Sequence, residues 1–243
     1  MKENKYDNEE FFEQYSRFPR SVEGLSAAGE WHELKKLLPD FGNKRVLDIG
    51  CGFGWHCIYA AEQGAAYVLG TDISEKMLAV AGEKTAFANV EYRRMAMEDI
   101  DFPADEFDVV ISSLAFHYTP DFGEICRRIG ACLKSGGDFV FSVEHPVFTA
   151  CGTQDWTYEE ERRVHWPVDR YFEEGERDAV FLGEHVTKYH KTLTTYLNTL
   201  LTTGFMITGI VEPQPAGHLL DTVPGMRDEL RRPMMLLVSA KKI

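Results

Sequence analysis

The chain has 243 residues, and 39 acidic against 26 basic side chains give it a formal net charge of −13. That acidic excess repels phosphate backbones and so disfavours a broad nucleic-acid contact. Hydrophobic residues account for 44% and charged residues for 27%, which excludes a disordered composition. No apolar run reaches the roughly 20 residues that cross a bilayer, and residues 1–13 are too polar for a signal peptide. We therefore expect a cytoplasmic globular chain without nucleic-acid or membrane partners.

The N-terminal part, residues 6–40, is expected to form two helices joined by a turn at residues 20–25. Two apolar stripes at helical spacing mark these helices: Phe11, Phe12, Tyr15 and Phe18, then Leu34, Leu37 and Leu38. We interpret residues 1–43 as a helical cover that precedes the main sheet.

From residue 44 to residue 145, strand-like runs alternate with helix-like runs, a pattern typical of βαβ units and a parallel sheet. The expected strands are residues 45–49, 67–71, 90–93, 107–112 and 138–143. A first helix is expected over residues 55–63, where Gly64 provides a natural helix end.

Capping residues predict the later helix boundaries. Ser74 can cap the helix after the second strand, and Asp121 followed by Glu124 has capping-box spacing. One buried stripe follows at steps of three and four: Phe122, Ile125, Ile129, Cys132 and Leu133. We expect Gly136 and Gly137 to end this helix before the fifth strand.

The alternation breaks near Glu144, and residues 146–190 form an expected insertion. Its aromatic residues are Trp156, Trp166, Tyr171 and Phe172. They could build a substrate lid, because so long a connection in a compact domain is usually functional, or equally a satellite core or a dimer contact. Residues 191–243 then predict a helix at 194–203 and strands at 205–211 and 234–239. The whole chain, residues 1–243, is interpreted as one domain.

The five cysteines give an odd count with no CxxC spacing. Cys51, His56 and Cys57 lie close together, but no second pair of ligands follows them, as a zinc site requires. We expect no metal site and interpret the thiols as small buried side chains.

The segment from Val46 to Gly54 is the chemical centre of the sequence. A strand enters a turn that contains Gly50, Gly52 and Gly54, and a helix follows. Glycine allows positive φ and a close approach of the backbone to a ligand. Asp72, at the end of the next strand, could accept hydrogen bonds from ribose hydroxyls. The alternatives are a simple tight turn and a charge near a helix N-terminus.

Two classes of ligand fit this arrangement, a dinucleotide and S-adenosylmethionine. The dinucleotide motif requires a third glycine, and this chain has Cys57 or Trp55 where that glycine would fall. Asp48, inside the strand, would repel a diphosphate but would favour a sulfonium or ammonium group. The sign of its charge therefore favours S-adenosylmethionine.

Four segments resemble the motifs of class I S-adenosylmethionine-dependent methyltransferases: Val46–Gly54, Gly70–Ser74, Phe107–Val110 and Leu133–Gly137. The branch most similar includes the ubiquinone/menaquinone-biosynthesis methyltransferases, and the resemblance covers about residues 44–145. It implies an α/β fold, a Rossmann-like three-layer sandwich with a seven-stranded, mostly parallel sheet and an antiparallel last strand. It also implies methyl transfer from S-adenosylmethionine to a small-molecule acceptor.

The resemblance assigns roles to particular residues. Gly50, Gly52 and Gly54 would approach the cofactor, Asp72 would bind its ribose, and Ile73 would pack against its adenine. Where family members carry an adenine-binding Asp, this chain has Ala96, so the backbone N–H groups of Met97 and Glu98 would reach the ring instead. From the N-terminal cover, Tyr15 or Arg20 could hold the methionine carboxylate, although core packing and a solvated charge are the alternatives.

Candidate chemical groups lie at the carboxyl ends of two strands, where α/β sheets bind ligands. His117 follows the fourth strand and is the first candidate for a general base, while Ser113 in the same run is expected to contact the cofactor. Glu144 or His145, after the fifth strand, could contact the substrate. Each histidine could also be a hydrogen-bonded structural residue.

Three functions remain open at this point. Methyl transfer to a small molecule is the favoured one. A non-catalytic protein that binds S-adenosylmethionine or S-adenosylhomocysteine is an alternative that Ala96 favours. An NAD(P)-dependent oxidoreductase is disfavoured by Asp48 and by the glycine spacing.

Overall fold

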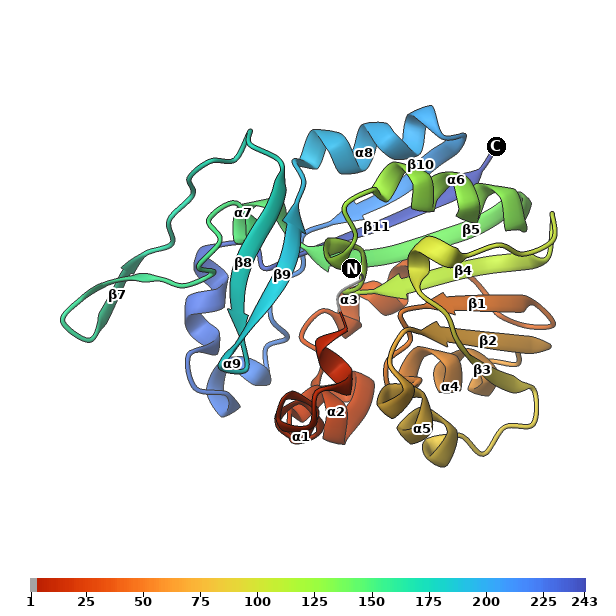
Figure 1. Ribbon diagram of the computed structural model, residues 1–243, viewed down its shortest axis with the longest axis horizontal. Coiled ribbons are helices and arrows are strands. Elements are labelled where there is room, and N and C mark those ends of the chain that lie inside the picture. Colours follow the sequence, from red (N-terminus) through yellow and green to blue (C-terminus); the bar gives the residue numbers. More distant parts are fainter. Residues whose placement is uncertain (1–3) are drawn as a thin grey trace.

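The computed structural model describes residues 4–243 and is built around one seven-stranded sheet (Figure 1). The strand order is β10-β11-β5-β4-β1-β2-β3, and β11 is antiparallel to both of its neighbours. The strands are β1 (Arg45–Ile49), β2 (Tyr67–Asp72), β3 (Val90–Arg94), β4 (Phe107–Ser113), β5 (Leu133–Glu144), β10 (Phe205–Val211) and β11 (Met235–Lys242). The predicted mostly parallel sheet with an antiparallel last strand is confirmed.

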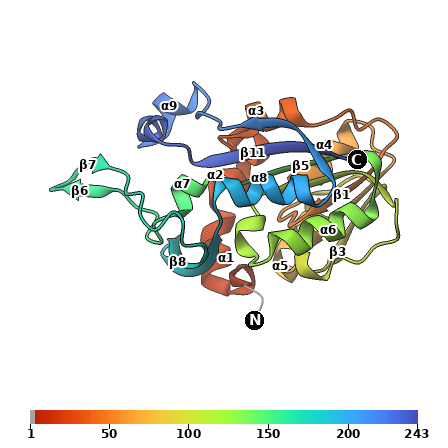
Figure 2. The ribbon, with the colours of Figure 1, turned by 90° about the horizontal axis from the view of Figure 1, so that it is seen from above.

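Helices cover both faces of this sheet, which gives the expected three layers. One face packs against α3 (Trp31–Leu37), α4 (Trp55–Glu62) and α5 (Glu75–Lys84), and the other against α6 (Phe122–Cys132) and α8 (Leu193–Thr202). Successive residues of β1 alternate between the two cores, as the pleat of a strand requires: Val46 packs with α4, and Leu47 packs on the α6 side. Figure 2 shows α6 and α8 side by side above one face.

The predicted helix signals act as expected. Ser74 accepts a hydrogen bond from the Met77 N–H at 3.1 Å, and Asp121 accepts one from the Glu124 N–H at 2.8 Å. The prediction that Gly136 and Gly137 separate α6 from the fifth strand is wrong. β5 already begins at Leu133 and contains both Gly136 and Gly137, with an irregular register against β4. Gly136 has φ +74°, so it absorbs the irregularity inside the strand instead of separating two elements.

The N-terminal cover holds more helix than the sequence predicted. It consists of η1 (Lys5–Asp7), α1 (Glu9–Ser16), α2 (Pro19–Glu23) and η2 (Gly24–Ala27), followed by α3. The expected turn at residues 20–25 is therefore wrong, because Pro19 occupies the first turn of α2, where its missing N–H costs nothing. Residues 1–3 of the expected cover lie outside the described residues.

The insertion contributes one short helix and two hairpins. α7 (Pro146–Thr149) is followed by β6 (Thr157–Glu159) with β7 (Arg162–His165), and then by β8 (Gly175–Phe181) with β9 (Glu184–His190). The β6–β7 hairpin projects from the body of the molecule, whereas β8–β9 crosses in front of the sheet end (Figures 1 and 2).

Two of the four predicted aromatic residues of the insertion, Trp156 and Trp166, belong to a satellite cluster, whereas Tyr171 packs against His190 and Phe172 is exposed. Phe148 stacks on Trp166 with ring centroids 4.9 Å apart, and the Arg232 guanidinium lies 3.9 Å from the Trp166 ring centroid. Arg232 comes from the connection between β10 and β11, which also contains α9 (Leu219–Thr222) and η5 (Met226–Arg231). Within residues 4–243, no helix is long and apolar enough to cross a membrane.

Candidate active site

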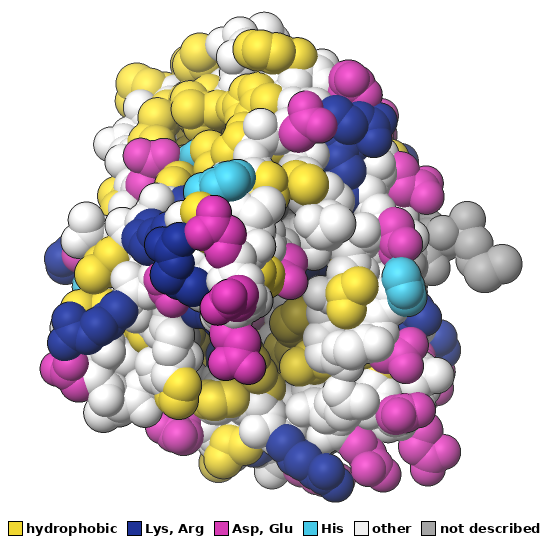
Figure 3. Space-filling view, turned by 90° about the vertical axis from the view of Figure 1, so that its left-hand side faces the viewer, with side chains coloured by type: hydrophobic (Ala, Val, Ile, Leu, Met, Phe, Trp, Pro, Cys, Tyr) yellow, Lys and Arg dark blue, Asp and Glu magenta, His cyan; other side chains and the backbone are white. Residues whose placement is uncertain are grey.

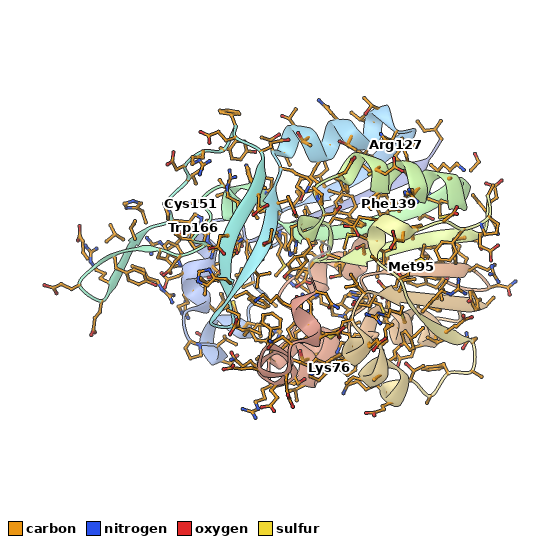
Figure 4. All side chains as sticks on the ribbon, viewed as in Figure 1. Lys76, Met95, Arg127, Phe139, Cys151 and Trp166 are labelled. Carbon is orange, nitrogen blue, oxygen red and sulfur yellow. The ribbon has the colours of Figure 1, made fainter. Side chains whose placement is uncertain are left out.

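A cavity of about 350 Å³ lies at the carboxyl ends of the central strands. Its lining comes from the N-terminal cover, the loops that follow β1, β2, β3 and β4, and the β8–β9 hairpin, together with the end of β5, the start of the insertion and the start of β11. Figure 3 views the molecule from the end that carries the insertion and shows hydrophobic side chains in the hollow between charged ones. In Figure 4, Met95 of the cavity lining is labelled, and Trp166 of the satellite cluster lies well away from it.

Ten of the thirteen predicted site residues line this cavity: Tyr15, Arg20, Gly50, Gly52, Asp72, Ile73, Met97, Glu98, Ser113 and His117. The other three, Asp48, Gly54 and His145, are not among its lining residues. Most of the residues that the sequence motifs singled out therefore lie around one cleft. The contacts of the three exceptions are described below.

The glycine loop and Asp72 are joined by backbone hydrogen bonds. The Gly52 N–H donates to Asp72 Oδ2 at 2.9 Å, and the Ser74 N–H donates to Asp72 Oδ1 at the same distance. Burial raises the pKa of the Asp72 carboxyl, and the Asp7 carboxylate nearby adds to that rise. Asp72 is thus fixed beside the loop with its remaining lone pairs available to a ligand.

Gly52 and Gly54 differ in the space that surrounds them. Gly52 has φ +53° and no atom within 4 Å of where a Cβ would stand, so its backbone is open to a ligand. Gly54 has φ +75°, and a Cβ there would meet Tyr92 Oη at 2.2 Å. The expectation that Gly54 approaches the cofactor is corrected: close packing against Tyr92 requires that glycine.

Asp48 is buried, with 1% of its surface exposed, and it lies on the face of β1 that packs against α4. Its carboxylate accepts a hydrogen bond from Cys57 Sγ at 3.3 Å, and burial raises its pKa to about 7. Its Oδ1 has no hydrogen-bond partner among residues 4–243. The pleat directs this side chain into the core and Asp48 is not among the residues that line the cavity, so its contact with a cationic ligand stays a prediction.

Arg20 of the cover reaches across to the sheet. Its guanidinium pairs with the buried Glu30 and also donates to Ser113 Oγ at 3.0 Å. Around it, Ser21 Oγ, Trp55 Nε1 and His56 Nε2 line the cavity without a hydrogen-bond partner among residues 4–243. Buried polar groups are costly when unpaired, so these atoms mark a place where a ligand's polar group would be held. Sequence reasoning missed Glu30, which stands directly before α3 and is marked by no motif; its partner Arg20 comes from α2.

His117 is 2% exposed, and burial lowers its pKa to about 4. Its Nδ1 accepts a long hydrogen bond of 3.5 Å from the Glu144 N–H. A neutral imidazole with an accepting Nδ1 carries its proton on Nε2. The ring therefore offers the cavity a donor, which argues against the predicted role of general base.

His145 caps α7 and does not reach the cavity. Its Nδ1 accepts from the Val147 N–H at 3.0 Å, and its Nε2 lies 2.8 Å from Glu212 Oε1. Burial lowers its pKa while Glu212 opposes that shift. The expected catalytic role is corrected to a structural one, because Pro146 begins a helix directly after this residue.

A polar cluster in the cavity wall was missed except for one member, Glu144. Lys188 Nζ lies 2.6 Å from Glu144 Oε1 and 2.9 Å from Gln154 Oε1, and Gln154 Nε2 donates to Glu144 Oε2 at 2.7 Å. All three line the cavity. Lys188 belongs to β9, whose alternation turns Val186, Lys188 and His190 to the buried side, so a lysine here occupies a position that pattern alone would give to an apolar residue.

The cover and the β8–β9 hairpin meet over the cavity. Phe11 and Phe18 contact Phe181 with ring centroids 6.0 and 6.3 Å apart, and Tyr6 Oη lies 3.2 Å from Tyr118 Oη. On the other side, Phe12 and Tyr15 of the cover pack against Phe53 of the glycine loop. The cavity is enclosed by aromatic contacts on two sides.

A doubly wound sheet with a glycine loop after β1 and a carboxylate at the end of β2 defines a nucleoside-binding α/β enzyme. Comparisons narrow that class. Residues 47–141 match the family model described as a methyltransferase domain. A putative S-adenosylmethionine-dependent methyltransferase from Listeria monocytogenes has a crystal structure that is 58% identical, covers 89% of this chain and 99% of its own, and superposes with a TM-score of 0.83.

Two curated proteins extend the comparison. An uncharacterised Haemophilus influenzae protein is 33% identical over 98% of this chain and 96% of its own length. A ubiquinone biosynthesis O-methyltransferase of Bradyrhizobium diazoefficiens is 38% identical over 49% of this chain and 47% of its own length. The chain belongs to the S-adenosylmethionine-dependent methyltransferases, and S-adenosylmethionine is its cofactor. The resemblance drawn from its motifs is confirmed.

Proposed function

We propose that this methyltransferase acts on a small-molecule acceptor, bound in the part of the cavity between His117, Phe181 and Lys188. The observation that carries this proposal is the enclosure of the site: the cofactor and the acceptor must share one cavity of about 350 Å³ under the cover and the β8–β9 hairpin, so the acceptor part suits a small organic molecule. The net charge of −13 disfavours an extended polyanion as the acceptor.

The cavity fits the cofactor at three places. Gly52 leaves its backbone open, and Asp72 has lone pairs for the ribose hydroxyls. Ile73 and Met97 supply apolar surface for the adenine, while Ala96 brings no side-chain polar group to it. Arg20, Ser21 and Trp55 together offer donors, which is the chemistry that a carboxylate requires. We assign them to the methionine end, with Tyr15 as a packing residue against Phe53.

When bound, S-adenosylmethionine supplies an electrophilic methyl group on a positively charged sulfur. The sulfonium is already a good leaving group and needs little activation. The chain therefore contributes mainly by aligning the acceptor with the methyl group and by excluding water. The Phe11–Phe181 and Phe18–Phe181 contacts close the cavity against solvent. His117 in its neutral form positions an acceptor through Nε2–H instead of removing a proton from it.

The test measures release of S-adenosylhomocysteine from S-adenosylmethionine with three sets of acceptors: a panel of small metabolites, bulk tRNA and a protein extract depleted of small molecules. We expect release with members of the metabolite panel alone. Release that depends on tRNA or protein, with none from small molecules, would overturn the small-molecule assignment.

The cofactor assignments have a separate test in the same preparation. Stability against heat should rise with S-adenosylhomocysteine and not with NAD(P), since a ligand at about 100 times its Kd adds about 2.7 kcal/mol. Arg20→Met should weaken binding of S-adenosylhomocysteine more than that of adenosine, which has no carboxylate. Equal weakening of both would remove Arg20 from the methionine end.

A further inference from the structure

Two hydrogen-bond donors face the acceptor part of the cavity, and both are positioned by Glu144. Lys188 is held through the Glu144 carboxylate, and His117 through the Glu144 backbone N–H. Glu144 is the last residue of β5, so the sheet itself fixes the place of these donors. Because an element of the rigid core sets the geometry, the pair is preorganised for a ligand.

Lys188 and His117 each have one N–H group without a hydrogen-bond acceptor in the described part of the chain. A lysine ammonium has three N–H bonds, and Lys188 directs two of them to Glu144 Oε1 and Gln154 Oε1. The Phe181 ring centroid lies 5.4 Å from the same Nζ, and the third N–H has no hydrogen-bond acceptor among residues 4–243. The Nε2 of His117 has no partner among residues 4–243, although its Nδ1 is engaged. Both residues line the cavity, so a ligand there meets two unused donors.

Each side-chain oxygen of Glu144 and Gln154 in the same wall already receives one hydrogen bond. Glu144 receives Lys188 on Oε1 and Gln154 on Oε2, and the Gln154 oxygen receives Lys188. The surroundings are apolar: Phe148, Val180, Phe181 and Val186 also line the cavity. A charged donor acts more strongly on a ligand in such an environment than it would in water.

From these observations we propose that Lys188 and His117 form a recognition site for an oxygen anion on the acceptor, a carboxylate or phenolate carried by a planar apolar body. This inference rests on the proposed function and deepens it by naming the class of acceptor. An amine or ammonium group in the same place would bring further N–H groups against two donors. The apolar wall receives the body of the acceptor, and the donor pair receives its oxygen.

Two matched pairs of probes test the proposal: benzoate against benzamide, and 4-nitrophenolate against 4-nitroaniline, each titrated by calorimetry with and without S-adenosylhomocysteine. We expect each anion to bind at least 10-fold more tightly than its neutral partner. In Lys188→Met/Glu144→Gln, which removes both charges of the pair together, the preference should fall to within about 3-fold. His117→Phe should reduce it in part, and Lys188→Arg should retain it.

The control is the surface pair Lys36–Glu33, whose Nζ–Oε1 distance of 2.7 Å resembles that of the buried pair. Lys36→Met/Glu33→Gln should leave the preference unchanged. Circular dichroism on each variant separates unfolding from loss of the site. No anion preference in the wild type, absence of binding included, overturns the proposal, as does a preference that survives in the buried double variant. Failure to bind S-adenosylhomocysteine counts instead against the cofactor assignments, because the titrations without it still judge the donor pair.

Discussion

The Asp7 carboxylate accepts a hydrogen bond of 2.6 Å from Ser74 Oγ and one of 3.2 Å from the Lys76 N–H. The N-terminal cover thus completes the cap of α5, two residues after the carboxylate of Asp72. Asp7 of the cover is therefore hydrogen-bonded to the same turn that holds Asp72, the expected ribose-binding residue. A change that loosens the cover should also loosen this turn.

Replacing Asp7 should therefore loosen the cover. Asp7→Ala removes two hydrogen bonds at a helix N-terminus and should lower the free energy of unfolding by about 1 kcal/mol at pH 7. Burial alone would raise the pKa of Asp7, but hydrogen bonds from Ser74, Asn4 and Lys76 lower it overall. A carboxylate with a lowered pKa stabilises the folded state above the unfolded pKa, so the difference should begin to shrink as the pH falls below about 4 and should be lost as the pH passes the folded-state pKa. Urea unfolding of both proteins at pH 7 and pH 3 measures this, and a difference as large at pH 3 as at pH 7 contradicts it.

Replacement by alanine should mainly affect ligand binding at Gly52 and mainly affect stability at Gly54. Gly52→Ala meets no atom within 4 Å and should fold at a cost of about 1 kcal/mol for its positive φ, yet lose binding of S-adenosylhomocysteine. Gly54→Ala places a Cβ 2.2 Å from Tyr92 Oη and should mainly lose stability. Thermal unfolding and calorimetric titration on the two variants separate the effects. Equal losses of binding in both would argue against an open Gly52 backbone.

Asp72→Asn tests the ribose contact while it keeps the size of the side chain. Loss of a charged acceptor costs about 1.5–3 kcal/mol, so the Kd of S-adenosylhomocysteine should rise by about 10- to 100-fold. Glu75→Gln, on the exposed first turn of α5, is the control and should change the Kd little. An unchanged Kd in Asp72→Asn would show that the ribose is bound elsewhere.

Stability should fall as the pH drops from about 6.5 to about 4, in part because of His117. Its folded-state pKa is lowered by burial to about 4, whereas an unfolded histidine titrates near 6.5. Between these values the unfolded chain binds a proton that the folded chain does not, which favours unfolding by up to about 3 kcal/mol. In His117→Gln the decline should be shallower. The same slope in both proteins, measured by urea unfolding at intervals of pH, would show that folding does not lower the pKa of His117.

The buried ion pair predicts unequal single and double variants. Glu144→Ala leaves the Lys188 ammonium unpaired and should cost about 3–5 kcal/mol, whereas Lys188→Met/Glu144→Gln should cost much less. At the exposed Lys36–Glu33 pair, Glu33→Ala should cost at most about 1 kcal/mol. Denaturant unfolding of the wild type and these three variants measures these values, and a double variant that costs as much as Glu144→Ala would contradict the coupling.

The sequence predicted most of the sheet because its strands and caps are local signals. The strand-like runs that alternate with helices and the capping at Ser74 and Asp121 need no tertiary information. The failures share one cause: position within a strand or helix decides what a side chain meets. Asp48 and Asp72 are both acids near a glycine loop, but the pleat turns the first into the core and the second lies at a strand end.

The acceptor wall was mostly beyond sequence reasoning for a related reason. Lys188, Gln154 and Glu144 are distant in the chain, and only the docking of the β8–β9 hairpin brings them together. His117 was found by its place after β4, whereas its protonation state depends on burial and on a backbone N–H from another strand. The sequence motifs located the cofactor part of the cavity, whereas the acceptor part depends on how the insertion packs.

Trp55 has a consequence for experiment. Among residues 4–243 it is the single tryptophan in the cavity lining, and its indole N–H has no hydrogen-bond partner there. Indole emission depends on the polarity around the ring, so a cofactor that reaches this nitrogen should change the colour of the protein's own fluorescence. With Trp31, Trp156 and Trp166 replaced by phenylalanine, the enzyme would carry an intrinsic optical reporter, and arrival of its methyl donor could be timed without any attached dye.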